Sequence, residues 1–261
     1  MNDSKSNCYD YPRYYEIAFS FRDIPYEVGV IEQTIDRYAL CDVRSLLELA
    51  CGPSQHMTEL SRRGLYFQGM DINQAMLDYS REKAIKARSD ASFHRQSMVK
   101  FQLEQPVEYV FIALGDLYVR STEELKSHLS SVATTLRQGG LFLLDWCVQF
   151  DPVKMFKADG DTWEIKDGSI CVKSCVKMRP TNYVEQLFEE QLDIEVEDAS
   201  TFLSLSSYSI KRAVYPQEFL ELIKNTNQFE FIGWWNNWDL DQPLTEKTQD
   251  VYRPITLLRR I

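Results

Sequence analysis

The chain has 261 residues, of which 44% are hydrophobic, so it is long enough for one large α/β domain with a substantial core. Its formal net charge of −10 argues against a nucleic-acid partner, because DNA and RNA repel an acidic chain that lacks a local basic patch. The 6 cysteines and 3 histidines form no C-x-x-C motif and no histidine cluster, which argues against a metal site.

The N-terminal part is rich in aromatic residues and is expected to be mainly helical from Tyr9 to Tyr38. It begins without the apolar segment of a secretory signal. The most apolar run, residues 141–148, is interrupted by Asp145 and is far too short to span a membrane. We therefore expect a cytoplasmic protein that does not bind a membrane.

The following hundred or so residues alternate between two patterns. Short apolar runs predict buried strands at residues 45–49, 65–70, 91–96, 107–114 and 141–145. Helical spacing predicts helices at residues 55–63, 73–88 and 122–136. Gly64 is placed to close the first of these helices, Asn73 to cap the second, and Gly139-Gly140 to end the third. This alternation predicts a parallel sheet with helices on both faces.

The pattern changes after Pro152. Residues 162–178, 183–196 and 202–214 are rich in β-branched and aromatic residues, which predicts antiparallel strands. A helix is then expected from Tyr215 to Asn225, and strands at residues 229–235 and 255–260. The tryptophans at 234, 235 and 238 favour a core or rim position over an aromatic cage for a methylated ammonium.

The loop after the first predicted strand reads Ala50-Cys51-Gly52-Pro53-Ser54. A dinucleotide site needs G-x-G-x-x-G for close approach to a pyrophosphate, so one glycine disfavours a nicotinamide-dependent oxidoreductase. A nucleoside without phosphates needs less. Gly52 offers one close backbone approach, and Asp71, after the next strand, offers a carboxylate that accepts both ribose hydroxyl protons.

Together these residues resemble the class I S-adenosylmethionine-dependent methyltransferases of the small-molecule branch. The first motif of that family matches Glu48 to Ser54, with Ala50 and Ser54 in place of two glycines, and its ribose-binding acid matches Asp71 in "GMDIN". The stretch "VEYVFIALGDLYVRSTEELKSHLSSVATTLRQGGLFLLDW" resembles its fourth strand, the following helix and the fifth strand, and "YPQEFLELIKNTNQFEFIGWW" its penultimate helix-strand unit.

The resemblance implies one α/β domain over residues 1–261, with a Rossmann-like seven-stranded methyltransferase sheet. Its parts are a helical N-terminal lid at 1–38, a cofactor-binding core at 39–152, an antiparallel β insertion at 153–213, and a helix and strands at 214–261 that complete the sheet. We expect the lid to close over the carboxyl edge. Deleting residues 1–22 should then leave a folded core without methyl transfer.

The resemblance also implies the site. The cofactor S-adenosyl-L-methionine is expected to contact Glu48, Ala50, Gly52, Asp71, Ile72, Gln96, Ser97, Met98 and Leu114, with Tyr14 or Tyr15 at its carboxylate. Glu48 is expected to meet its amino group. Either Gln96 or Ser97 would accept the adenine amino group, and Met98 would cover the adenine. Asp116, after the fourth strand, would contact the methionine part, position an amine or act as base; otherwise it is a helix-proximal cap.

The expected reaction is methyl transfer from S-adenosylmethionine to a small-molecule amine or hydroxyl. No residue is obviously a strong base, which favours an amine or an oxygen that is already ionised. The alternative is a non-catalytic scaffold that binds the cofactor or its product. We expect a monomer or homodimer with no metal and no nucleic-acid partner.

Overall fold

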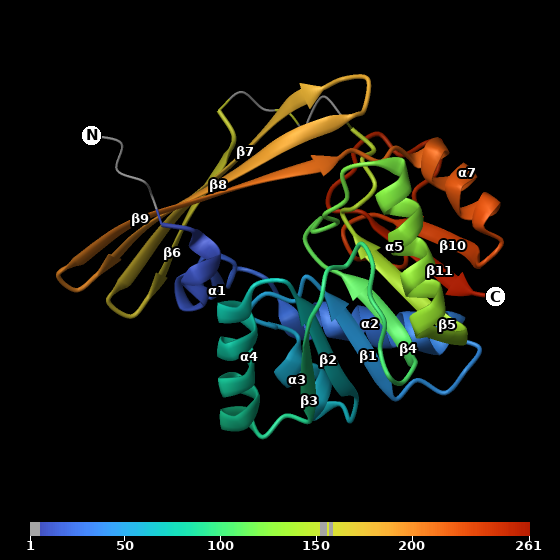
Figure 1. The fold of residues 1–261 in the computed structure, drawn as a ribbon, viewed down its shortest axis with the longest axis horizontal. Helices are drawn as coiled ribbons and strands as arrows, with labels where there is room; N and C mark the ends of the chain where they lie inside the picture. Colours follow the sequence, from blue (N-terminus) through green and yellow to red (C-terminus); the bar gives the residue numbers. More distant parts are fainter. Residues whose placement is uncertain (1–5, 152–155, 157–158) are drawn as a thin grey trace.

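The computed structural model describes residues 6–151, 156 and 159–261, and its centre is a seven-stranded sheet (Figure 1). The strands are β1 (Ser45–Leu49), β2 (Tyr66–Asp71), β3 (Ala91–Arg95), β4 (Val107–Ile112), β5 (Leu136–Asp145), β10 (Phe229–Trp235) and β11 (Ile255–Arg260). Their order is β10-β11-β5-β4-β1-β2-β3. β1 to β5 pair in parallel, and β11 is antiparallel to both its neighbours. The predicted seven-stranded α/β fold is confirmed.

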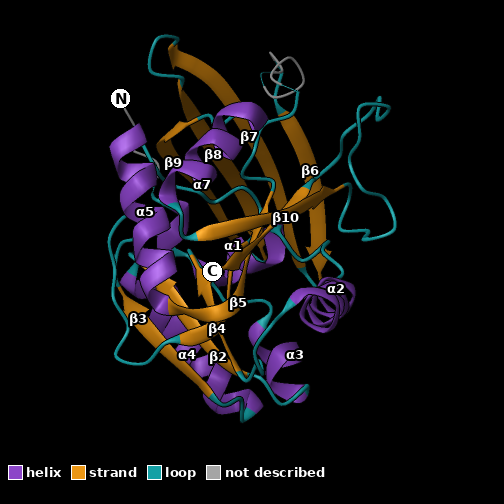
Figure 2. Cartoon of the chain, turned by 90° about the vertical axis from the view of Figure 1, so that its right-hand side faces the viewer, coloured by secondary structure: helices purple, strands orange, loops and turns teal. Residues whose placement is uncertain are grey.

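Helices cover both faces of this sheet (Figures 1 and 2). One face packs on α2 (Ile24–Tyr38), α3 (Met57–Arg62) and α4 (Gln74–Ala87), and the other on α5 (Thr122–Thr135) and α7 (Pro216–Thr226). Adjacent strand residues point to opposite faces, so Leu46 packs with the first set and Leu47 with the second. Each such fully buried side chain contributes about 1.5–3 kcal/mol. Two packed faces therefore hold the carboxyl ends of the strands in place.

Two of the predicted helix ends, the start of α4 at Asn73 and the end of α3 at Gly64, are confirmed. The Asn73 side chain accepts a hydrogen bond from the backbone N–H of Met76 at 3.1 Å, and Ser121 accepts one from Glu124 at 3.1 Å. These caps satisfy N–H groups that have no partner within the helix. Gly64 follows α3 with φ +81°, a conformation in which a side chain is strained.

Two predictions of local structure are wrong. No turn separates α5 from β5, because the strand already begins at Leu136 and includes Gly139-Gly140. A Cβ on Gly140 would lie 2.5 Å from the Glu108 carbonyl oxygen, so Gly140 lets β5 approach β4 closely, and a Cβ on Gly139 would lie 2.9 Å from the Leu40 Cβ. The expected strand at 162–178 is in fact two strands joined by the two-residue turn Gly168-Ser169, where Gly168 has φ +59°. A Gly-Ser pair between two strand patterns is a hairpin signal.

The inserted segment forms a second sheet that projects from the first (Figure 1). Its antiparallel strands are β6 (Asp161–Asp167), β7 (Ile170–Asn182), β8 (Leu187–Asp198) and β9 (Thr201–Arg212), in that order, which confirms the predicted antiparallel insertion. β9 lies at the edge of this sheet.

The N-terminal segment fills the space between the two sheets and α4. It consists of the short helix η1 (Cys8–Asp10) and α1 (Pro12–Ala18). Cys8, Ile17 and Ala18 join one apolar cluster with residues of β7, β8 and β9. The segment is therefore part of the core of the insertion as well as a cover for the carboxyl edge.

Two further expectations concern burial. Trp235 and Trp238 are buried in the core, as predicted, and the Trp238 indole N–H donates to Asp145 at 2.9 Å. Among the described helices, none is long and apolar enough to span a membrane.

Candidate active site

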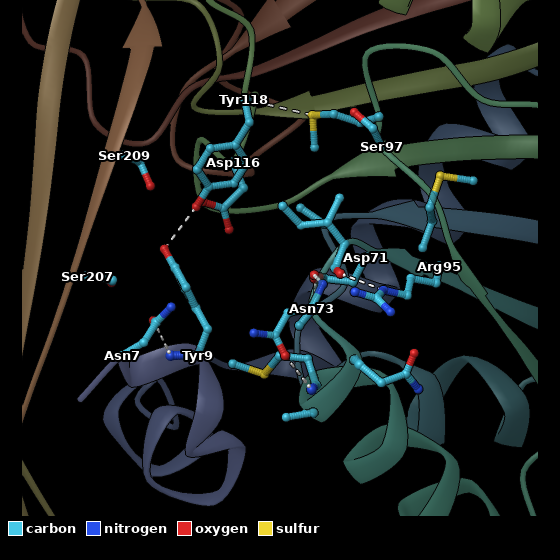
Figure 3. Close-up of a pocket in the computed structure, with 18 of the residues that line it drawn as sticks. Asn7, Tyr9, Asp71, Asn73, Arg95, Ser97, Asp116, Tyr118, Ser207 and Ser209 are labelled. Atoms are coloured by element: carbon cyan, nitrogen blue, oxygen red, sulfur yellow. Dashed lines mark hydrogen bonds between the residues drawn. The ribbon is translucent and has the colours of Figure 1, made fainter.

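A cavity of about 920 Å³ lies at the carboxyl edge of the parallel strands (Figure 3). Its walls come from the loops after β1, β2, β3 and β4, from the N-terminal segment, and from β9 of the insertion. Ligands of open α/β sheets bind at this edge, beyond the carboxyl ends of the strands. The volume is near the upper end of the range for small-molecule sites.

The loop after β1 has an unusual backbone. Ala50, Gly52 and Ser54 have φ values of 52°, 48° and 50°. These are the three positions at which the resembled family carries glycine. Ala50 and Ser54 therefore adopt the left-handed conformation despite their side chains, at a cost of about 1–2 kcal/mol each. The loop therefore keeps the left-handed conformation at all three positions although only Gly52 is a glycine.

Asp71 ties this loop to β2. Its Oδ2 accepts the backbone N–H of Gly52 at 2.9 Å, and its Oδ1 accepts that of Asn73 at 2.8 Å. A carboxylate has about four acceptor positions, so two remain for hydroxyl groups of a ligand in the cavity. Burial raises the pKa of Asp71 above its usual value, while the backbone hydrogen bonds act in the opposite direction.

Other predicted contacts also line the cavity. Ala50, Ile72 and Met98 belong to its wall, and Tyr15 lies over Gly52, where an added Cβ would meet the tyrosine Cε1 at 4.0 Å. This is an ordinary van der Waals distance, so the space between Gly52 and Tyr15 is open, and it is the positive φ of Gly52 that favours glycine there.

Gln96 and Ser97 are in the wall, but their polar groups already have partners. The Gln96 amide exchanges hydrogen bonds with the backbone of Gln102 at 3.0 and 3.2 Å. The Ser97 hydroxyl accepts the N–H of Val99 at 3.3 Å. Because its amide is held by the backbone, Gln96 is the weaker candidate for an adenine contact, and the Ser97 hydroxyl oxygen keeps a second lone pair that can accept the adenine amino group.

Three predicted contacts are not part of the cavity wall. Glu48 is buried, with Oε1 2.8 Å from Nδ1 of His56. The Leu114 N–H donates to Asp145 at 2.7 Å. The Tyr14 hydroxyl donates to Asp198 of the insertion at 3.0 Å. These three groups thus lie outside the cavity wall, and their contact with a ligand stays a prediction; of the two tyrosines it is Tyr15 that lines the cavity.

Asp116 lies between two parts of the cavity. In Figure 3, Asp71, Asn73 and Arg95 lie on one side of Tyr9, Tyr118 and Asp116, and Ser207 and Ser209 of β9 on the other. The two parts are the nucleoside side, around Asp71, and the β9 side, around Ser209. Asp116 is thus placed at their junction.

Asp116 is held by residues that the sequence did not reveal. Its Oδ1 accepts the hydroxyl of Tyr118 at 3.0 Å and lies 3.5 Å from the Lys211 Nζ. Lys211 is 2.8 Å from Glu190 and lies over the Tyr118 ring, and Tyr9 is 3.2 Å from the Tyr118 hydroxyl. Both of these contacts to Asp116 use Oδ1, so within the described part of the chain Oδ2 is left for a ligand.

The ionisation of this group follows from its surroundings. Burial raises the pKa of Asp116 to about 6, against the opposing effect of Lys211, and Glu190 and Asp71 raise it further. Burial alone would lower the pKa of Lys211, but Glu190 and Asp116 raise it above its usual value. Lys211 is therefore a permanent buried cation, and Asp116 titrates close to neutral pH.

A buried ionic network lies behind the loop after β1 and the loop after β4 that carries Asp116. Glu27 of α2 contacts Nε2 of His56 at 3.0 Å and Nη1 of Arg253 at 2.7 Å. Arg253 also makes a paired contact with Asp145, and His56 contacts Glu48. Burial opposes a charge on His56, but Glu48 and Glu27 raise its pKa above the usual value. The network links the loop after β1, at residues 50–54, to the loop that carries Asp116.

Lys211, Glu190 and Tyr118 carry no motif, and only their position beside Asp116 identifies them. Arg95 also lines the cavity, and its Nε donates to the Ile72 carbonyl at 3.1 Å. The one available signal was the run Ser204-Leu205-Ser206-Ser207-Tyr208-Ser209, which is too polar for an ordinary strand with one buried face.

The chain was compared with known proteins. A family model described as a methyltransferase domain matches residues 46–140. A curated relative, the dTDP-3-amino-3,4,6-trideoxy-alpha-D-glucopyranose N,N-dimethyltransferase of Streptomyces venezuelae, is 28% identical over 107 residues, or 40% of this chain and 43% of the relative. The dTDP-4-amino-2,3,4,6-tetradeoxy-D-glucose N,N-dimethyltransferase of Saccharopolyspora spinosa is 26% identical over 125 residues, 48% of each chain. The chain thus spans less than half the length of these curated relatives.

Solved structures match over more of the chain. A S-adenosylmethionine-dependent methyltransferase from Clostridium acetobutylicum superposes with a TM-score of 0.75 at 15% identity, over 97% of this chain and 99% of that one. Streptomyces venezuelae DesVI gives a TM-score of 0.75 at 17% identity, over 96% of this chain and 98% of that one. At these identities the superpositions establish a shared fold.

Proposed function

We propose that this chain, which has the class I S-adenosylmethionine-dependent methyltransferase fold and carries a methyltransferase domain at residues 46–140, transfers methyl groups to the amine of a small molecule. The predicted family resemblance and fold class are confirmed by these matches. The activity, the cofactor and the acceptor are our proposals.

The observation that carries the proposal is the place of Asp116. Its carboxyl group lies where the nucleoside side of the cavity meets the β9 side, with Oδ2 free of the contacts made by Oδ1. A methyl donor bound on one side and an acceptor bound on the other would react at this point. A carboxylate there attracts an ammonium group, whereas it would repel an ionised oxygen nucleophile.

The nucleoside side fits S-adenosylmethionine. Asp71 keeps two acceptor positions for ribose hydroxyls, and Gly52 lies open beneath Tyr15. Met98 and Ser97 are placed to meet the adenine ring, with Ile72 beside them in the wall. Bound S-adenosylmethionine supplies a methyl carbon that is already activated by the sulfonium. The chain then needs to align the acceptor and exclude water.

Asp116 has a defined part in this reaction. An acceptor amine reaches the site as an ammonium ion, whose nitrogen has no free lone pair. With a pKa of about 6, Asp116 is mostly ionised at neutral pH and can accept the ammonium proton on Oδ2. The nitrogen then forms its bond to the methyl carbon as the carbon–sulfur bond breaks, and S-adenosylhomocysteine leaves uncharged.

The acceptor we propose is an amino sugar. Both curated relatives are named as N,N-dimethyltransferases of dTDP-linked amino sugars, and the β9 side of this cavity is lined with hydroxyl-bearing residues. The predictions of a cytoplasmic location, of a monomer or homodimer and of no nucleic-acid partner remain predictions. No feature of the described residues favours the non-catalytic alternative.

The test is the pH dependence of turnover with dTDP-3-amino-3,4,6-trideoxy-α-D-glucopyranose as acceptor. The acceptor kcat/KM should rise as pH rises through about 6, because Asp116 must lose its proton to act as base. The positive sulfonium moves this rise to lower pH. Asp116→Asn should lower kcat about 10²-fold or more and remove the rise. A variant that keeps the wild-type profile would remove Asp116 from proton transfer.

A further inference from the structure

The exposed edge of β9 faces the cavity. β9 is the last strand of the insertion sheet, so only β8 pairs with it along its full length. In an antiparallel pair, every second residue directs its N–H and C=O toward the partner strand, and the residues between direct theirs away. One set of β9 backbone groups therefore points out of the sheet.

Two hydrogen bonds show which residues make up this outward set. The Ser206 N–H donates to the Ser6 carbonyl at 2.9 Å, and the Arg212 N–H donates to the Val119 carbonyl at 2.7 Å. Both partners lie outside the sheet, and the pairing of β8 with β9 is regular between them. The even-numbered residues therefore face outward, and these include Tyr208 and Ile210.

Tyr208 and Ile210 both line the cavity, between the points where Ser6 and Val119 close the edge. Among the described residues, no hydrogen bond is found for their outward N–H and C=O groups. An open edge normally invites pairing with another chain, but this one is closed at both ends and recessed in a cavity. The closing residues Ser206 and Arg212 are about 20 Å apart along the strand, and Tyr208 and Ile210 between them are about 7 Å apart, at 3.4 Å per residue.

We propose that this open edge is the subsite that holds the acceptor, by hydrogen bonds from the backbone of Tyr208 and Ile210 to hydroxyl groups flanking the acceptor amine. The inference rests on the proposed function and adds the backbone groups that would hold the hydroxyls of a polyhydroxylated amine. Alternating N–H and C=O groups suit hydroxyls, because a hydroxyl both donates and accepts. The Ser209 hydroxyl, in the wall between them, has the same capacity.

The position of the edge relative to Asp116 supports this assignment. Lys211, the next residue after Ile210, has its ammonium 3.5 Å from Asp116 Oδ1. Asp116 and residues 208–210 line the same cavity, so a ring held along this edge would share that cavity with the carboxylate that receives the ammonium proton. Backbone groups that lose water without gaining a partner weaken binding, so an acceptor without these hydroxyls is disfavoured.

The experiment removes one hydrogen-bonding group from the protein and, separately, its expected partner from the acceptor. The acceptors are dTDP-3-amino-3,6-dideoxy-α-D-glucose and the same compound without its 4-hydroxyl. Tyr208→Pro removes the outward N–H without removing a bond to β8, and Tyr208→Ala removes the side chain but keeps the N–H. Phe202→Pro, on the same edge outside the cavity wall, controls for proline in this strand.

The wild type, Tyr208→Ala and Phe202→Pro should each prefer the 4-hydroxyl acceptor by about tenfold in kcat/KM, the effect of one hydrogen bond. Tyr208→Pro should lose that preference and keep wild-type affinity for S-adenosylmethionine. Equal use of both acceptors by the wild type, or an unchanged preference in Tyr208→Pro, would overturn the inference. Absence of methylation by the wild type would instead contradict the proposed function.

A binding measurement decides the inference without turnover, and without a variant that must fold with proline. The protein is labelled with ¹⁵N-tyrosine, and the amide signal of Tyr208 is identified by its loss in Tyr208→Phe. With S-adenosylhomocysteine present, the 4-hydroxyl acceptor should shift this signal more than the 4-deoxy acceptor does. A Tyr208 signal that neither acceptor moves would show that the edge is not the subsite.

Discussion

Replacing Asp71 with alanine tests the nucleoside side of the cavity. The carboxylate has two separable tasks in this structure. It accepts the N–H groups of Gly52 and Asn73, which fixes the loop, and it keeps two acceptor positions for the ribose of the cofactor. Asp71→Ala removes both, so stability and cofactor affinity should fall together but by different amounts.

The magnitudes follow from the hydrogen bonds. Losing hydrogen bonds to a charged acceptor costs about 1.5–3 kcal/mol, which is roughly 10- to 150-fold in the dissociation constant of S-adenosylmethionine. The two backbone N–H groups are only partly buried, so water replaces much of their lost bonding. We expect a stability loss of about 1–2 kcal/mol and a fall in Tm of about 2–4 °C per kcal/mol.

The assay is titration calorimetry at a temperature where both proteins are folded, with thermal melting beside it. Ser121→Ala is the matched control, because it removes the N-cap of α5 at a cost of about 1 kcal/mol and lies outside the cavity wall. The control should melt lower and bind S-adenosylmethionine as the wild type does. An unchanged affinity in Asp71→Ala, or an equal loss in Ser121→Ala, would refute the assignment of Asp71 to the ribose.

Three further predictions concern stability. Burial lowers the pKa of His128 to about 4, so the neutral ring contributes fully to the free energy of unfolding above pH 6.5, and this contribution is lost as pH falls toward 4. In urea unfolding, His128→Leu should remove about 3 kcal/mol of the change in unfolding free energy over this pH range; an unchanged pH dependence would contradict the prediction. Arg253→Met removes the cation that pairs with the buried carboxylates of Asp145 and Glu27, so the free energy of unfolding in urea should fall by about 3–5 kcal/mol. A fall under 1 kcal/mol would show that the network rearranges around the loss. Deleting residues 1–22 uncovers the apolar face of the insertion, so the product should bind a hydrophobic dye and melt less cooperatively; a normal melt without dye binding would favour the folded core expected from the sequence.

The sheet was predictable because its signals are local. The parallel strands β1 and β4 are short apolar runs buried on both faces, and the caps at Asn73 and Ser121 are set by residues next to the helices they begin. The errors arose where a local pattern was ambiguous or overridden by packing. The turn at Gly168-Ser169 lay inside one long β-rich run, and Gly139-Gly140 resembles a turn, although Gly140 instead allows close contact between β5 and β4.

The site was only half predictable, for a physical reason. Gly52 and Asp71 follow consecutive strands, so their meeting is fixed by the topology of the parallel sheet. Lys211 and Glu190 reach Asp116 from an insertion whose placement over the edge no local pattern encodes. Glu48 carries the right residue type in the right motif, yet its carboxylate is buried against His56.

The central claim is that this cavity brings a methyl donor and an amine together at Asp116. The most direct test incubates the protein with S-adenosylmethionine carrying an isotope-labelled methyl group and with dTDP-3-amino-3,4,6-trideoxy-α-D-glucopyranose, and locates the label in the product by mass spectrometry and NMR. Label on the amine nitrogen, with Asp116→Asn slower by about 10²-fold or more, is the predicted result. Label on a sugar oxygen, or transfer that does not depend on Asp116, would contradict the account.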